Sequence, residues 1–182
     1  VHNAVTVQFY TKQQNAYILV TSIHLKQRFI VVIEAVGTIF LSLKTKRVML
    51  GLRSAEGTHP LTWSFFGGKV EQGESFGVAL KREIKEELIF VPKILKTYPL
   101  DNFVSNDEAF KYASFVSIIN SEFHPILNDE NDGYAWVKIG AWPKPLHAGT
   151  KLILHNKNNV NKLTSILQRE LKENPGVSPE AP

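Results

Sequence analysis

A change in the spacing of apolar residues at Glu74 constrains the fold of this chain more than any other feature. From there to Leu88, the residues Leu80, Ile84 and Leu88 recur every four positions, which is the spacing of one helix face. The runs before and after this segment are rich in β-branched and aromatic residues, as is typical of strands. A helix set between strand-rich stretches favours an α+β fold or a three-layer α/β/α arrangement.

The remaining elements follow from the same two periodicities. A second helix is expected over 160–171, because Pro175 and Gly176 follow it and end the helical pattern. Between the strand at 63–66 and the first helix, Gly67 and Gly68 indicate a loop whose backbone adopts conformations that other residues avoid. Strands are expected at 4–10, 16–23, 29–43, 47–52, 63–66, 94–98, 110–119 and 134–139.

Length and composition indicate one globular domain. The chain has 182 residues, of which 43% are hydrophobic and 21% charged, so it can build a single core of ordinary size. We expect an N-terminal extension of extra strands at 1–28, the main domain at 29–173 and a disordered Pro-rich tail at 174–182. The longest apolar run is interrupted by polar residues and no secretory signal is recognisable, so we expect no membrane span and a cytoplasmic protein.

The charge and cysteine counts exclude some classes of site. No cysteine is present, which excludes disulfides, thiolate metal ligands and a cysteine nucleophile. The formal net charge is +4, but the lysines and arginines are scattered along the sequence and form no block. A nucleic-acid-binding stripe is therefore not the first interpretation, and we expect an ordinary solvated surface.

Three glutamates of the first helix form the main candidate site. Glu83, Glu86 and Glu87 stand at positions i, i+3 and i+4, which places their carboxylates on one side of a helix within about 100° of arc. Their mutual repulsion would be relieved by a hard divalent cation such as Mg²⁺ or Mn²⁺. The alternative is a solvated acidic face with neighbouring lysines and arginine as partners.

The segment around these glutamates resembles the Nudix box. Residues 68–88 read GKVEQGESFGVALKREIKEEL, which matches the family's glycine, glutamate, Arg-Glu and Glu-Glu positions at the family spacing. The resemblance covers roughly residues 29–142. One position departs from it, because Ile89 stands where the family has a glycine in the left-handed conformation. A β-branched residue resists that conformation, so we expect the helix to end otherwise, near Val91 before Pro92.

The resemblance implies a fold, an activity and a metal site. The fold is an α/β/α sandwich with a curved mixed β-sheet between helices. The activity is cleavage of a nucleoside diphosphate linked to another group, by attack of metal-activated water on a phosphorus of the pyrophosphate. Glu83, Glu86 and Glu87 would hold Mg²⁺, with Mn²⁺ as a substitute, and the Gly67 carbonyl would be a further ligand. Glu83 is also a candidate base.

Other residues receive roles by the same resemblance. Arg82 would orient the carboxylates of the helix, with Glu74 and Gly68 as structural support. Arg53 and Lys69 match positions that contact phosphates, and solvated charges are the alternative for both.

A further acidic residue is expected downstream of the box. Glu130 is the choice for this role, and Glu108 is its competitor. For both of them a solvated loop acid is the alternative.

The residues leave the substrate open between several classes. The sequence GGKVEQGE at 67–74 resembles the MutT-type branch, which converts nucleoside triphosphates to monophosphate and pyrophosphate. Nucleotide sugars, ADP-ribose and an RNA 5′ end are alternatives, and so is a nucleotide-binding sensor without activity. Because Arg82, Glu83, Glu86 and Glu87 are all present, hydrolysis is favoured over sensing. The expected partner is a small nucleotide, with a monomer or homodimer as the assembly and no nucleic acid beyond an RNA 5′ end.

Overall fold

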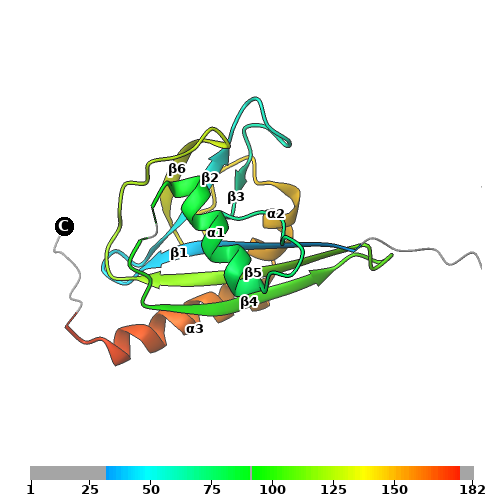
Figure 1. Cartoon of the computed structure of the whole chain (residues 1–182). Coiled ribbons are helices and arrows are strands. Elements are labelled where there is room, and N and C mark those ends of the chain that lie inside the picture. Colours follow the sequence, from blue (N-terminus) through cyan, green and yellow to red (C-terminus); the bar gives the residue numbers. More distant parts are fainter. Residues whose placement is uncertain (1–31, 91, 177–182) are drawn as a thin grey trace, which may run out of the picture. The chain divides into compact units, whose positions relative to one another are not determined.

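The computed structural model describes residues 32–90 and 92–176 (Figure 1). The strands expected at 4–10 and 16–23 and the extension at 1–28 lie outside the described residues, as does the tail from 177 onward. Within the described part, no helix has the length and apolar character that a membrane crossing requires.

The described strands form one mixed, six-stranded sheet with the order β3-β2-β1-β5-β4, and β6 pairs with β2 off this path. β1 and β5 run parallel over ten paired positions, whereas the other pairs are antiparallel. The strands are β1 (Ile33–Ser42), β2 (Arg47–Arg53), β3 (Trp63–Ser64), β4 (Lys96–Val104), β5 (Phe110–Ile119) and β6 (Asn131–Lys138).

Helices cover both faces of the sheet. α1 (Phe76–Leu88) packs on one face in a core with Val36 and Phe40 of β1, while α2 (Ala148–Leu154) and α3 (Lys157–Glu173) pack on the other face with Ile39 and Leu41. The alternation along β1 follows from the two-residue period of a strand, whose side chains point to opposite faces in turn. Figure 1 shows α1 in front of β1 and β5, with α3 beside β4. The expected α+β sandwich with a mixed sheet is confirmed.

Several boundaries differ from the expected ones. β4 continues to Val104, although the expected strand ended at 98, because its pairing with β5 extends through polar residues that carry no strand signal. The helix α2 was not expected at all, since its seven residues are too few to display a helical period. The second expected helix, at 160–171, is α3 and is longer at both ends.

The prediction for the end of α1 was wrong. The helix ends at Leu88, and Ile89 adopts the left-handed conformation with φ 58° and ψ −9°, despite its β-branched side chain. The chain is anchored on both sides of this residue: the Glu87 carbonyl accepts a hydrogen bond from the Asn128 N–H at 3.0 Å, and the Phe90 ring packs against Phe123. These contacts outweigh a backbone cost of about 1–2 kcal/mol.

Candidate active site

The loop that precedes α1 is fixed by backbone pairing with β1. The Val36 N–H donates to the Gly68 carbonyl at 2.9 Å, and the Thr38 N–H donates to the Phe66 carbonyl at 2.8 Å. Gly67, between these bonds, has φ 141°, and a Cβ there would lie 2.2 Å from the Val36 carbonyl oxygen. Only glycine permits this close approach. The loop therefore presents the Gly67 backbone to α1.

Glu87 is the most deeply buried carboxylate beside this loop. Its side chain accepts a hydrogen bond from the Gly67 N–H at 2.6 Å and another from the Asn131 amide at 3.1 Å, and the residue is only 3% exposed. Burial raises the pKa of Glu87 to about 8, although both hydrogen bonds oppose the shift, and the charges of Glu130 and Glu83 raise it further. Its partners in this arrangement are all neutral donors.

Glu83 is buried one turn earlier on the same face. Its carboxylate packs directly on Gly68, where an added Cβ would lie 2.6 Å from one of its oxygens. Gly68 is therefore required by the space that the carboxylate occupies. Burial raises the pKa of Glu83, the Arg82 guanidinium opposes this, and the charges of Glu86 and Glu130 reinforce it.

Arg82 connects the loop to the helix. Its guanidinium donates two hydrogen bonds of 2.9 Å to Glu74 and one of 2.9 Å to the Lys69 carbonyl. It also donates to Glu83 at 2.9 Å and to Glu86 at 3.1 Å. The bond to Arg82 is the main cause that lowers the pKa of Glu74 to about 2. Arginine has five N–H donors in a planar fork, so it can make these five hydrogen bonds, whereas lysine has only three donors.

The alternative of a solvated acidic face holds for only one of the three glutamates. Glu86 has a half-exposed side chain, whereas Glu83 and Glu87 are among the buried residues of α1. In residues 32–90 and 92–176, no three acidic or histidine side chains converge in a metal-binding arrangement. The physical reason is that Arg82 holds Glu83 and Glu86, while Glu87 is bonded to the Gly67 N–H and to Asn131.

The donors nevertheless fit a hard divalent cation. Glu83, Glu86 and Glu87 supply carboxylate oxygens, and the adjacent Gly67 supplies a carbonyl, which is the ligand chemistry that Mg²⁺ prefers. Burial and neighbouring carboxylates disfavour the anionic forms of Glu83 and Glu87, and a cation would relieve both effects. Glu83 and Glu86 would each have to exchange a hydrogen bond with Arg82 for contact with the cation.

Glu130 lies beside this cluster, in the turn before β6. Its backbone carbonyl accepts from the Ser54 N–H at 2.8 Å, its side chain is exposed, and its charge acts on both Glu83 and Glu87. Glu108 lies in the turn between β4 and β5 and is not among the charges that act on these two carboxylates. The fold thus brings one of the two downstream candidates to the cluster.

The two phosphate-binding candidates differ in their surroundings. Arg53 ends β2 and donates two hydrogen bonds to Thr58, at 2.8 Å to its carbonyl and at 3.1 Å to its hydroxyl. Its guanidinium therefore holds the loop between β2 and β3. Lys69 is exposed next to the double glycine, and its carbonyl accepts from Arg82.

Sequence reasoning missed Asn131. Its amide bonds Glu87 across 44 positions of sequence, and its side chain fills the space over Gly51, where an added Cβ would lie 2.7 Å from the amide oxygen. The only available signal was its place in the acidic, Asn-rich stretch at which β6 begins. That stretch gives no information about which residue turns inward.

Comparison with known proteins identifies a family and a fold. A family model for the NUDIX domain matches residues 33–156. The fold is similar to that of a Nudix hydrolase from M. smegmatis, with 16% identity, 77% of this chain and 87% of that chain covered, and a TM-score of 0.56. It is also similar to an Ap4A hydrolase from C. elegans, with 18% identity, coverage of 75% and 98%, and a TM-score of 0.54. A MutT protein from Methanosarcina mazei Go1 gives 21% identity, coverage of 78% and 96%, and a TM-score of 0.52.

Proposed function

The chain belongs to the Nudix hydrolase family, and from this premise we propose that it is a Mg²⁺-dependent pyrophosphohydrolase of small nucleotides. One observation carries the proposal: Glu87 and Glu83 are buried carboxylates packed on the Gly67–Gly68 loop, and within residues 32–90 and 92–176 Glu87 has no cationic partner. A buried carboxylate without a counter-charge costs stability, so its place in the fold points to a role in binding a cation.

The residues of this chain divide the work of the reaction. Mg²⁺, or Mn²⁺ in its place, would be held by Glu83, Glu86, Glu87 and the Gly67 carbonyl. The bound ion would neutralise phosphate charge and lower the pKa of a water molecule. Glu83 is the candidate base, because burial brings its pKa closer to the working range of a proton acceptor. Arg82 positions Glu83 and Glu86 through its hydrogen bonds. Glu130 adds negative charge near the same site.

For the substrate, we favour a nucleoside triphosphate that is converted to monophosphate and pyrophosphate. The support is the likeness of residues 67–74 to the MutT-type pattern. Lys69 follows the double glycine and is exposed, so it can reach a phosphate without losing an ion pair. Arg53 would contact the phosphates only after exchanging its bonds to Thr58.

The proposal is tested by screening pyrophosphate-containing nucleotides with Mg²⁺ or Mn²⁺ and identifying the products. The panel contains ribo- and deoxyribonucleoside triphosphates, ADP-ribose, nucleotide sugars and dinucleoside polyphosphates. We expect monophosphate and pyrophosphate from a triphosphate, with loss of activity on adding a chelator. Turnover that survives chelation would contradict the metal site, and preference for another substrate would replace the triphosphate assignment.

A further inference from the structure

The exposed face of α3 gathers cations that are scattered in the sequence. Lys157, Lys162, Arg169 and Lys172 are all exposed, and at 3.6 residues per turn they fall within about 140° of arc. From Lys157 to Lys172 they span about 22 Å along the helix axis. On the same helix face, the positions between them are occupied by Asn158, Asn161, Ser165 and Gln168. We call these four residues the α3 strip.

The two acidic residues of α3 do not neutralise the strip. Glu170 is fully buried and bonds Lys96 at 3.1 Å, and Glu173 bonds the same lysine. Among residues 32–90 and 92–176, neither Lys162 nor Arg169 has a carboxylate within ion-pairing distance. Lys162 and Arg169 therefore form no ion pair in the described part of the molecule, and the nearest acidic influence on Arg169 is the Glu173 carboxylate, which is bonded to Lys96.

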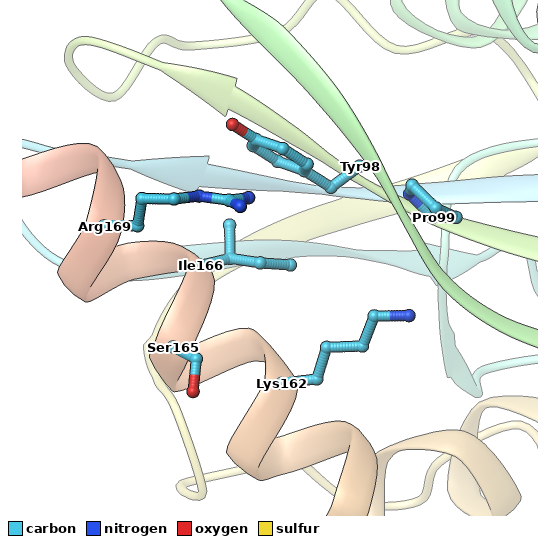
Figure 2. A pocket seen from close by; sticks show the side chains of 6 residues that line it. All are labelled: Tyr98, Pro99, Lys162, Ser165, Ile166 and Arg169. Atoms are coloured by element: carbon cyan, nitrogen blue, oxygen red, sulfur yellow. The ribbon is translucent and has the colours of Figure 1, made fainter. Parts of the chain in front are cut away.

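A groove of about 410 Å³ runs along the strip, between α3 and β4. Figure 2 shows Lys162, Ile166 and Arg169 extending from α3 toward β4, where Tyr98 and Pro99 form the opposite wall. The Arg169 guanidinium carbon lies 4.5 Å from the centroid of the Tyr98 ring, and the Lys162 ammonium donates to the Leu100 carbonyl at 3.0 Å. The groove thus combines an apolar floor with one cation toward each end.

We propose that the α3 strip and this groove bind single-stranded nucleic acid. Phosphates would contact Lys162 and Arg169, and one base would lie in the groove between Pro99 and the Arg169 side chain. Single-stranded nucleic acids are bound by proteins through this combination of a cationic track and stacking surfaces. The site lies on the face of the sheet opposite to α1, so it is separate from the candidate active site.

Other polyanions fit the surface less well. A membrane surface requires an apolar helix face for insertion, and none of the exposed large apolar residues in the described part of the chain belongs to α3. A protein partner would be expected to bury an extended apolar centre, whereas the apolar surface here is confined to the groove floor and the exposed residues of α3 around it are cationic or polar. The test therefore includes an acidic polypeptide and an anionic lipid as competitors of the nucleic acid.

The test measures binding of a labelled single-stranded RNA of about twelve nucleotides with a 5′-hydroxyl end, which offers no pyrophosphate to hydrolyse. Reversing both charges in K162E/R169E should weaken binding tenfold or more. It should also reduce the slope of log affinity against log salt by about 1.4, because each phosphate contact on a single strand contributes about 0.7. Nucleotide hydrolysis should be unchanged, since neither residue lies in the proposed active site.

The matched control is K46E/K138E, which changes the net charge equally at two exposed lysines outside the strip. It should retain RNA affinity to within about threefold. The neutral pair K162Q/R169Q provides a second variant if charge reversal impairs folding. The proposal would be overturned if K46E/K138E lost as much RNA affinity as K162E/R169E. It would also be overturned if the full chain did not bind the RNA. Preferential binding of polyglutamate or of phosphatidylserine vesicles in competition with the RNA would likewise overturn it.

Discussion

Glu87 on α1 and Glu170 on α3 are both buried glutamates, but they are satisfied in different ways. Glu170 accepts hydrogen bonds from the Lys96 ammonium at 3.1 Å and from the Tyr98 hydroxyl, so a cation compensates its charge. In the described part of the chain, Glu87 accepts only from the neutral Gly67 N–H and Asn131 amide, and the carboxylates of Glu130 and Glu83 lie nearby. Two residues of the same type at similar burial therefore carry different electrostatic costs.

This difference separates a structural charge from a functional one. A buried carboxylate that is paired with a cation is compatible with a purely structural role, because the pairing offsets its loss of hydration. A buried carboxylate among other carboxylates destabilises the fold unless a cation binds. We infer that Glu170 holds α3 against β4, whereas Glu87 is maintained for the chemistry of the site. The first two predictions below each test one side of this comparison, and the later two extend it to the helix ends and to a part-buried histidine.

The largest expected effect is on turnover in Glu87→Gln. Removing the charge of a proposed metal ligand should lower kcat on the order of 100-fold or more. The thermal midpoint should stay level or rise, since an uncompensated buried charge is removed and the Asn131 amide can flip to keep both hydrogen bonds. Steady-state kinetics and thermal unfolding are the measurements. Glu71→Gln, an exposed change in the same loop–helix segment, is the control and should match the parent in both.

The next largest effect is on stability in Lys96→Met. This change leaves Glu170 buried without its cation and so gives it the environment of Glu87. Unfolding free energy should fall, because Glu170 stays fully buried and loses its cation, and the exposure of Lys96 moderates the loss. In the double variant K96M/E170Q most of the loss should be recovered. If K96M unfolds like the parent while kcat falls, the assignment of this pair as structural is wrong.

The two glutamates also show what the sequence could predict. The spacing of Glu83, Glu86 and Glu87 predicted a shared helix face, because the interaction is local and follows from 3.6 residues per turn. The partners of Glu87 and Glu170 could not be predicted, since Asn131 and Lys96 are 44 and 74 positions away and only the folded sheet brings them close. The same limit applied to the lysines of α3, which are scattered in sequence and adjacent only on the helix.

Glycine substitutions at the C-terminal ends of α1 and α3 should change stability by smaller amounts and in opposite directions. The residue that follows α1 is Ile89, with φ 58°. The residue that follows α3 is Asn174, with φ −125°, and its N–H and side-chain amide both donate to the Glu170 carbonyl. Ile89→Gly should raise the unfolding free energy by about 1 kcal/mol, because glycine adopts the left-handed conformation without strain. Asn174→Gly should lower it, since a side-chain hydrogen bond is lost and no strain is relieved. Denaturant titration of both variants measures the contrast, and a gain in both or in neither would contradict it.

The smallest effect concerns His147. Burial disfavours its charged form, as it does for Glu87, but His147 becomes neutral by losing a proton and so needs no counter-ion. Its Nδ1 accepts from the Gly149 N–H at 3.2 Å at the start of α2, and its ring packs on His59. Burial lowers the pKa of His147, and the charges of His59 and Arg53 lower it further. A lowered folded-state pKa means that its contribution to stability is complete above the ordinary value of about 6.5 and is lost as the pH falls below it. Unfolding measured from about pH 7.5 to about pH 5.5 should show this loss, at most about 1 kcal/mol. His147→Asn keeps a capping side chain without a titrating group, so it should flatten this part of the profile; an equally steep profile in that variant would assign the pH dependence to another residue.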